Sequence, residues 1–494
     1  MLIGPACAPR TAGPPVPAAS TPTSIASRIE SILEAAPANR ALWGIVIRRA
    51  GGEILYQRES SRLFHPASNM KILTLAAAAE RLGWDFTYET VVRATGELDR
   101  GTVRGDVVVV GAGDPTIGRR FDGEKTLAGW ADRLWELGVR RIEGRVIGDD
   151  SRFAGTTYGD GWQWDDLPFG YSAPVSALSY NENTAELLVA PGATAGARAT
   201  VTLVDRAAVI QIRNEVSTAA GETARRISMS QRPGDAAVTV SGEVPLGFEP
   251  FKMTVAVPDP PLYFARAFRA ALVARGIIVA GAARSAATDP PGPSAPDAPT
   301  FVRHRSPPLS VIGATLMKVS QNLYAELLLR TLGAAAGKPG TDALADALTG
   351  WGMSSGAVAV GDGSGLTRYN LVTASTVDLV LSRMFTSAVS REPWIATMPV
   401  AGQDGTLQRR LKGTPAEGRV FAKTGSIAYV RALSGYARSL DDQWIQFTIL
   451  ANNFAGPGAA ADVDRATDQI VTLLVTMPEA ASRIAAGSPS RPPP

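Results

Sequence analysis

The chain has 494 residues, of which 49 are basic and 46 acidic, and its formal net charge is +3. Because the two signs are interspersed, the composition gives no support for binding to nucleic acid. No apolar run reaches about 18 residues, so no transmembrane helix is predicted. The single cysteine, Cys7, excludes an internal disulfide. The length suits two or three domains with hydrophobic cores of their own.

Residues 1–21 are predicted to be a flexible N-terminus or the remnant of an export signal. Residues 1–8 contain small residues, as the end of an export signal does, but lack a basic start and a long apolar core. We therefore expect that this start truncates a longer export signal. A lipid anchor at Cys7 is the alternative, although its neighbours fit that modification poorly. At the other end, residues 481–494 are predicted to form a disordered tail.

The first globular segment, residues 22–92, begins with a predicted β-hairpin. Its strands cover residues 43–49 and 53–57, and Gly51 and Gly52 form the turn between them. The segment then continues into a motif whose residues are candidates for catalysis.

The motif S-x-x-K occurs once, at Ser68 and Lys71, near the start of a predicted helix that ends close to Gly83. Residues 72–79 are apolar almost all round, so this helix is expected to be buried. The first turn of a helix offers free N–H groups and the positive end of the helix dipole. Lys71 follows Ser68 by one turn on the same face, close enough to accept its proton. Taken alone, the segment could also be a capping serine followed by a surface lysine.

Residues 93–299 are predicted to be an insert of one or two domains. It is rich in short strands, such as residues 107–110, separated by glycine turns. A nested subdomain is predicted near residues 190–245. The Pro-rich residues 289–296 are interpreted as a linker. It leads back to residues 300–480, the second part of the domain that residues 22–92 begin.

The motif S-x-N occurs twice, and the copy at Ser320 and Asn322 lies between helical segments over residues 311–333. Polar side chains among buried apolar turns need partners, or they cost about 1–3 kcal/mol each. A helix N-cap at Ser320 is the alternative if this motif stands alone. The other copy, residues 179–181, precedes a strand-like run and is interpreted as structural.

Other hydrolase arrangements fit less well. The two histidines, His65 and His304, leave few candidates for a Ser-His-Asp triad, and His65 is interpreted as structural. One G-x-S-x-G sequence occurs at residues 352–356, but a nucleophile elbow needs a strand before it and a helix after it. A strand-like run follows here, so we interpret the segment as a turn. No H-E-x-x-H motif is present, and we predict neither a metal site nor a cofactor.

The motif K-T-G occurs once, at Lys423, Thr424 and Gly425, in a strand predicted from Val420 onward. Threonine and glycine suit a strand that a substrate can approach closely. Two more strands and a closing amphipathic helix are predicted at about residues 430–437, 444–452 and 461–477.

In combination, the three motifs match the signature of penicillin-sensitive acyl transfer. A serine hydroxyl becomes a good nucleophile when a base removes its proton. Lys71 can be that base if burial or another cation lowers its pKa. Ser320 is predicted to relay the proton towards the leaving amine, and Asn322 to orient Lys71 and the substrate. Lys423 and Thr424 are predicted to hold the terminal carboxylate of the substrate.

The backbone N–H groups of Ser68 and Ser426 are predicted to form the oxyanion hole, where losing one donor typically costs about 3–4 kcal/mol. The chain has only seven lysines, and two of them fall inside the motifs. The ordered combination is therefore far more specific than any one motif.

On these motifs the chain resembles the large-insert (class C) branch of the low-molecular-mass penicillin-binding proteins, the D-alanyl-D-alanine carboxypeptidase/endopeptidase family. Other segments also resemble that family, namely residues 111–116, 148–153, 362–366 and 402–407. The resemblance runs from about residue 25 to 478. It implies an α/β (α+β) fold, a penicillin-recognising serine transpeptidase-like domain whose antiparallel sheet is flanked by helices, with a large β-rich insert.

The resemblance implies peptidoglycan stem peptides as substrates and β-lactam antibiotics as inhibitors. Terminal D-Ala-D-Ala would be cleaved, and often D-Ala-diaminopimelate cross-links, in the periplasm or another extracytoplasmic part of the cell envelope. By resemblance, Lys423, Gly425 and Ser426 contact the substrate, and Asp149 and Arg368 read the diaminopimelate side chain. A structural salt bridge is the alternative for these last two. Gln321 stands where the family more often has Asp or Asn, and we expect little consequence.

Two other functions use the same acylation chemistry. A class A β-lactamase deacylates with a glutamate that has Asn four residues on, and none of Glu326, Glu392 and Glu417 between the second and third motifs has it. A wall-binding or sensor protein would be acylated without turning over. Release of free D-alanine from a stem pentapeptide separates this last case from a peptidase.

Overall fold

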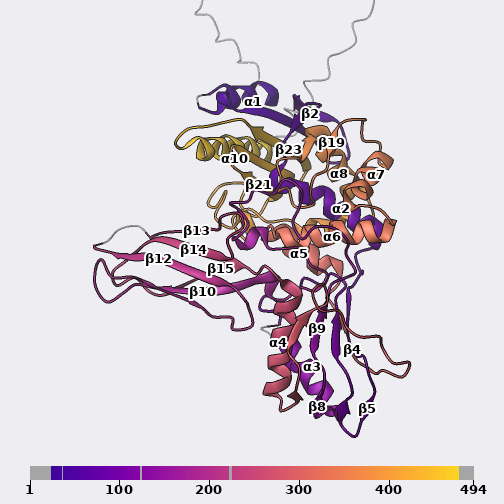
Figure 1. The fold of residues 1–494 in the computed structure, drawn as a ribbon. Helices are drawn as coiled ribbons and strands as arrows, with labels where there is room; N and C mark the ends of the chain where they lie inside the picture. The colour runs from indigo at the N-terminus through magenta and orange to yellow at the C-terminus, as the bar shows by residue number, and fades with distance from the viewer. Residues whose placement is uncertain (1–23, 36, 123–124, 222–224, 478–494) are drawn as a thin grey trace, which may run out of the picture.

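The computed structural model describes residues 24–35, 37–122, 125–221 and 225–477. Figure 1 shows an upper body that contains both ends of this range and two lower lobes formed by the middle of the chain. None of the described helices is long and apolar enough to span a bilayer. The predictions for Cys7, residues 1–21 and residues 481–494 fall outside the described residues.

The upper body is built on a five-stranded antiparallel sheet with strand order β2-β1-β23-β22-β21. Its strands are β1 (Leu42–Arg49), β2 (Ile54–Arg58), β21 (Val420–Ile427), β22 (Val430–Arg438) and β23 (Trp444–Asn452). The predicted hairpin thus pairs with strands almost 400 residues later, and β1 joins β23. Strand β21, which carries K-T-G, forms one edge of the sheet.

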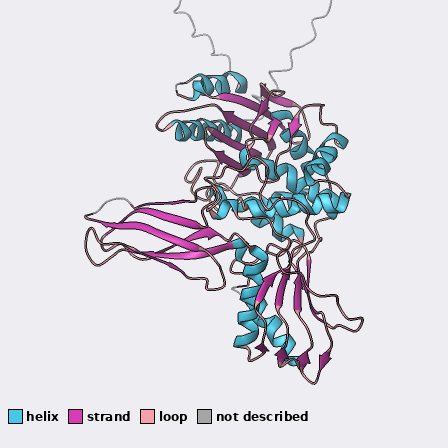
Figure 2. Cartoon of the chain, in the orientation of Figure 1, coloured by secondary structure: helices cyan, strands magenta, loops and turns pink. Residues whose placement is uncertain are grey.

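Helices cover both faces of this sheet, because side chains alternate between the faces along each strand. Ile45 and Ile47 of β1 pack in the core under α1 (Ile25–Glu34) and α10 (Ala459–Thr476). Val46, between them, packs in the core on the opposite face. Helix α8 (Ala374–Thr386) contacts β1 and β23 on that face. The result is the predicted antiparallel sheet flanked by helices (Figure 2).

Helix α2 (Met70–Leu82) is the central helix of the body, and every residue from Met70 to Ala79 is buried. It contacts α8 and three further helices. These are α5 (Leu309–Lys318), α6 (Asn322–Ala336) and α7 (Gly340–Gly350), and α9 (Arg391–Thr397) lies against α5. A small sheet of β3 (Leu63–Phe64), β20 (Leu371–Thr373) and β19 (Val358–Ala359) borders this helical layer. The predicted buried helix and helix pair are confirmed.

One lower lobe contains two sheets, with strand orders β17-β9-β7-β4-β18 and β16-β8-β6-β5. Their strands are β4 (Glu89–Ala94), β5 (Leu98–Asp99), β6 (Thr102–Val103), β7 (Val107–Val110), β8 (Arg141–Ile142), β9 (Val146–Asp149), β16 (Ile278–Val279), β17 (Ala283–Ser285) and β18 (Thr300–Arg305). Strand β7 coincides with the Val-rich strand expected at residues 107–110.

Two helices that the sequence analysis did not name, α3 (Lys125–Glu136) and α4 (Pro260–Ala274), pack in the same lobe. Helix α4 carries a clear start signal, because Asp259 accepts a hydrogen bond from the Leu262 N–H (3.0 Å) and Pro260 opens the first turn. Phe264 and Phe268, on the apolar face of this helix, belong to the hydrophobic core of the lobe.

The other lobe, drawn out to the left in Figure 1, consists of two three-stranded sheets with orders β11-β10-β15 and β12-β14-β13. Their strands are β10 (Thr184–Ala190), β11 (Thr200–Leu203), β12 (Gln211–Ala219), β13 (Arg226–Ser230), β14 (Ala237–Pro245) and β15 (Phe251–Ala256). Buried side chains such as Leu187, Val216 and Val240 belong to the same hydrophobic core as α3 and α4. The two lobes therefore share one continuous core.

Candidate active site

Ser68 lies in a short 3-10 turn, η2 (Ala67–Asn69), that leads directly into α2. The turn packs against β21 and β22. Glycines on two neighbouring segments allow this close packing. A Cβ atom at Gly365 would lie 1.8 Å from the Ala67 carbonyl oxygen, and one at Gly425 would lie 2.8 Å from that of Pro66. Ser68 is thus held between the K-T-G strand and the loop that contains Gly365.

Lys71 is fully buried, and its Nζ lies within hydrogen-bond distance of three oxygens. They are Ser68 Oγ (2.9 Å), Asn322 Oδ1 (2.6 Å) and the Ser364 carbonyl (2.7 Å). Burial lowers the pKa of Lys71 to about 7, against the opposing effect of the nearby Asp362 and Glu326 carboxylates. A neutral amine can donate its two hydrogens to Asn322 and Ser364 and accept the proton of Ser68.

The second motif occupies the break between α5 and α6, as the sequence predicts. Ser320 has a φ of 60°, which places it in the left-handed region, and its Oγ lies 2.8 Å from Lys423 Nζ. Asn322 opens α6, and its Nδ2 donates to the carbonyl of Tyr171 (2.7 Å). Asn322 therefore joins Lys71 to a short turn of the insert, η3 (Gly170–Ser172).

Lys423 is also fully buried, and its Nζ donates to Ser320 Oγ and to the carbonyl of Thr424, both at 2.8 Å. Burial, with a further contribution from the charge of Lys71, lowers its pKa well below the ordinary value. The next residues turn outward along the edge of the sheet. Thr424 Oγ1 donates to Thr406 Oγ1 (2.7 Å), and Ser426 is exposed. The K-T-G residues thus lie on an edge strand of the sheet.

Two buried acidic residues, Glu326 and Asp362, hold the loop that contacts Lys71. The sequence analysis did not assign them this position. Glu326 of α6 accepts hydrogen bonds from the N–H groups of Gly363 (3.1 Å) and Ser364 (2.8 Å). Burial, followed by the neighbouring Asp362 carboxylate, raises the pKa of Glu326 to about 7. Asp362 in turn accepts from the N–H groups of Gly365 (2.7 Å) and of Thr367. These bonds fix the loop whose carbonyl faces Lys71.

The sequence contained one signal for this support. Residues 362–366 resemble a family segment, but nothing in their types reveals that a backbone carbonyl is the functional group. Glu326 was considered only as a deacylating glutamate, and its carboxylate instead binds backbone N–H groups.

Arg368 and Asp149 occupy different positions relative to the motifs. Arg368 donates to the carbonyl of Ala428 (2.7 Å), in the turn that follows the K-T-G strand. Asp149 ends β9 and accepts from the N–H of Ser151 (2.9 Å). Within the described ranges, no hydrogen bond or ion pair joins Asp149 to the three motifs.

His65 Nδ1 lies 3.2 Å from the carbonyl of Asn370, which fits a structural residue.

The structure thus brings the three motifs together, because Lys71 contacts Ser68 and Asn322 while Lys423 contacts Ser320. A family model described as the D-Ala-D-Ala carboxypeptidase 3 (S13) family matches residues 25–474. The chain belongs to this family. The fold class and the family predicted from the three motifs are therefore confirmed.

Relatives of this S13 carboxypeptidase cover nearly its whole length. It is 34% identical to the D-alanyl-D-alanine carboxypeptidase of Actinomadura sp. (strain R39) over 90% of this chain and 83% of that protein. It is 26% identical to the D-alanyl-D-alanine carboxypeptidase DacB of Haemophilus influenzae over 82% of this chain and 83% of that one.

The crystal structure of penicillin binding protein 4 from Haemophilus influenzae shares the fold, with a TM-score of 0.79 and 24% identity. The alignment covers 91% of this chain and 99% of that chain. The S13 carboxypeptidase is a serine-type hydrolase that acts on D-Ala-D-Ala ends, and the β-lactamase alternative is not favoured.

Proposed function

We propose that the S13 carboxypeptidase forms an acyl-enzyme at Ser68, with Lys71 as the base that activates it. The observation that carries this proposal is the contact between a fully buried lysine and the serine hydroxyl, 2.9 Å apart at the start of α2. Neutral Lys71 accepts the proton while the Ser68 oxygen attacks the carbonyl carbon between the two D-alanines. Lys71 can do so because its two other contacts, Asn322 and Ser364, are acceptors.

The negative charge on the tetrahedral intermediate is stabilised by the N–H groups of Ser68 and Ser426. Ser320 relays to the leaving nitrogen the proton that Lys71 took from Ser68, so that Lys71 is neutral again, the C–N bond breaks, and D-alanine departs. Lys423 and Thr424 bind the terminal carboxylate of the substrate. Water then attacks the ester at Ser68, releasing the shortened peptide and restoring the hydroxyl.

Peptidoglycan stem peptides are the proposed substrates, and cross-links between D-Ala and diaminopimelate are included. Arg368 supports this extension because it lies beside the turn that follows Ser426. Asp149 is the less direct candidate for the same recognition. The protein would work in the periplasm or another extracytoplasmic part of the cell envelope, where such peptides occur.

β-Lactam antibiotics are the proposed inhibitors. A structure of the Haemophilus influenzae protein was determined with a β-lactam, and a relative from Dictyostelium discoideum is called penicillin-sensitive carboxypeptidase A. We further propose that residues 22–92 and 300–480 form the catalytic domain and residues 93–299 the insert, with a nested unit near 190–245. Strands β4 and β18, which lie at the two boundaries, pair with each other in the lower lobe.

The experiment is intact-protein mass spectrometry after brief exposure to benzylpenicillin, followed by measurement of D-alanine released from a stem pentapeptide. Wild type is expected to gain the mass of one penicillin, and Ser68→Ala to gain none. Ser354→Ala is the matched control, because Ser354 is the exposed serine of the G-x-S-x-G turn and should leave acylation unchanged. An adduct in Ser68→Ala would refute the assignment of the nucleophile. Hydrolysed drug without an adduct would indicate a β-lactamase, and acylation without D-alanine release a sensor.

A further inference from the structure

The side chain of Gln321, in the middle of the second motif, connects the catalytic body to the insert. Its Oε1 accepts the N–H of Leu323 (3.2 Å) and so caps α6, while its Nε2 donates to Glu182 Oε2 (2.8 Å). The hydroxyl of Tyr324, also on α6, lies 3.2 Å from Glu182 Oε1. Glu182 therefore binds two side chains that flank Asn322 in sequence.

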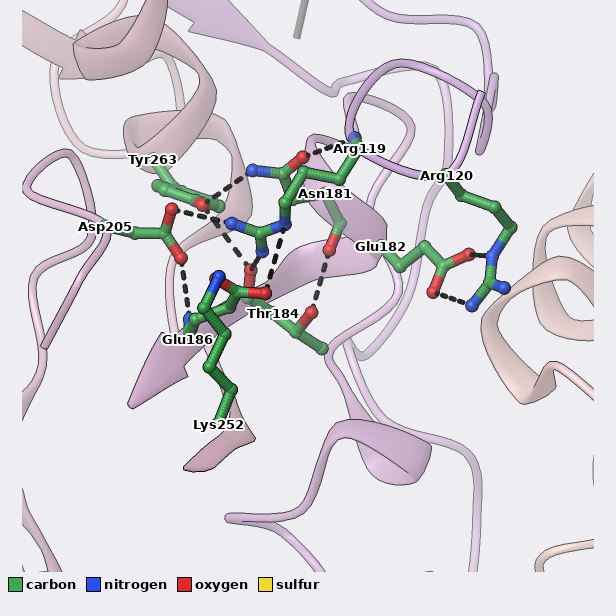
Figure 3. Close-up of polar contacts among 9 residues, drawn as sticks. All are labelled: Arg119, Arg120, Asn181, Glu182, Thr184, Glu186, Asp205, Lys252 and Tyr263. Carbon is green, nitrogen blue, oxygen red and sulfur yellow. Dashed lines mark hydrogen bonds and ion pairs between the residues drawn. The ribbon is translucent and has the colours of Figure 1, made fainter. Parts of the chain in front are cut away.

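Glu182 is itself fixed by an ion pair on the insert. Arg120 Nη2 donates to Glu182 Oε2 (2.9 Å), and Arg120 Nε contacts the other carboxylate oxygen. The Glu182 side chain is only 15% exposed, so it is oriented by these partners and little by solvent. Figure 3 shows this pair set apart from the neighbouring polar group around Arg119 and Asp205. One acid thus links an insert arginine to the motif.

The backbone under Glu182 is strained. Residues 181, 182 and 183 all have positive φ values, of 51°, 57° and 55°, in the short turn η4 (Asn181–Asn183). Asparagine enters this region more readily than other residues, but glutamate does so at a cost. The turn is held by its neighbours, since Asn183 Nδ2 donates to the Pro174 carbonyl (2.8 Å) and Thr184 Oγ1 to that of Asn181 (2.8 Å). Such local strain concentrates at functional sites.

The segment that receives this contact is strained as well. Ser320 has a φ of 60° immediately before Gln321. Its hydroxyl and the Asn322 amide must both reach buried lysines, at 2.8 Å from Lys423 and 2.6 Å from Lys71. A small rotation of the loop would lengthen both contacts together. A fixed side chain at Gln321, between Ser320 and Asn322, would therefore hold both of these contacts in place.

We propose that Glu182 is a positioning residue for the acyl-transfer reaction, which it supports by anchoring Gln321 so that Ser320 and Asn322 face the two lysines. The inference rests on the proposed roles of Ser320 and Asn322. It also revises the expectation that glutamine in the middle of the motif has little consequence, because an amide N–H is needed to meet the Glu182 carboxylate. The insert thereby contributes to catalysis without touching the reacting atoms.

The test compares the rate of Ser68 acylation by benzylpenicillin in single and reversed variants. Gln321→Glu places a second carboxylate opposite that of Glu182. It is expected to lower the acylation rate by about 10- to 100-fold, because misplacement of catalytic groups by about 1 Å has effects of this size. Glu182→Gln with Gln321→Glu restores one donor and one acceptor between the two side chains in reversed order, although the new amide also meets Arg120 Nη2, which donates to Glu182 Oε2 in the wild type. This double variant is therefore expected to recover part of the lost rate, to within about tenfold of wild type.

Two further measurements separate positioning from a general loss of stability. Glu182→Ala should lower the rate plateau without moving the pH of half-maximal acylation, and its Tm is measured alongside. Asp205→Asn is the matched control, because Asp205 pairs with Arg119 (2.7 Å) on the same lobe. It is expected to lower Tm while leaving acylation unchanged.

Wild-type acylation at Ser68 in the same experiment tests the proposed function separately. The inference itself would be overturned by wild-type rates in Gln321→Glu and Glu182→Ala. It would also be overturned by a double variant that is no faster than Gln321→Glu, or by an Asp205→Asn variant that loses as much rate as Glu182→Ala at a similar loss of Tm.

Discussion

The pH dependence of Ser68 acylation is the sharpest prediction from the site. Lys71 acts as a base only when it is neutral, and burial lowers its pKa from 10.5 to about 7. The rate constant should therefore rise with pH, reach half its plateau near pH 7, and be flat above about pH 8. Below the pKa the neutral fraction falls about tenfold per pH unit, so the rate at pH 5 should be about 100-fold below the plateau.

The assay is the rate of adduct formation with benzylpenicillin, followed by intact mass in buffers of constant ionic strength from about pH 5 to 9. Incubation of the drug alone corrects for its own hydrolysis, and Ser68→Ala corrects for non-specific adducts. A rate that is independent of pH over this range would refute the role of Lys71 as the base. Half-maximal acylation above about pH 9 would instead show that burial lowers the pKa of Lys71 by less than the structure indicates.

Two further outcomes are expected from the loop behind the site. Gly365→Ala should abolish measurable acylation and destabilise the protein by about 1–3 kcal/mol, because φ is +84° and the new Cβ would lie 1.8 Å from the Ala67 carbonyl. Gly129→Ala, in open space on α3, is the matched control and should preserve the rate without lowering Tm, because alanine favours a helix more than glycine does. Glu326→Gln should move half-maximal acylation to lower pH, because the carboxylate of Glu326 raises the pKa of Lys71. A shift to higher pH, measured in the same assay, would contradict this electrostatic argument.

Local patterns explain why much of the catalytic body was predictable. Ser68 and Lys71 are one helical turn apart, so the chain itself brings them together once the helix forms. The strand with Lys423 and the helix break at Ser320 were equally visible in composition. Their mutual contacts span 103 residues and more, and only the known order of the motifs indicated that these segments would meet.

The rest of the site depends on groups that residue types do not reveal. The carbonyls of Ser364 and Tyr171 contact Lys71 and Asn322 because of where the backbone runs, and any residue has a carbonyl. The contact between Gln321 and Glu182 joins positions 139 residues apart. It depends on a strained turn that sequence patterns do not predict. Helix α4 is a different case, since its start signal at Asp259 was present and was overlooked among the strands of the insert.

In the proposed mechanism, the two buried lysines explain how one site binds an anion and still keeps a neutral base. Both pKa values are lowered by burial, and the charge of Lys71 lowers that of Lys423 further. A substrate carboxylate beside Lys423 favours its ammonium form and so raises its pKa. That positive charge, which the substrate carboxylate partly offsets, then acts with burial against a second ammonium at Lys71. Recognition of the terminal carboxylate and activation of Ser68 are thus two effects of one electrostatic coupling.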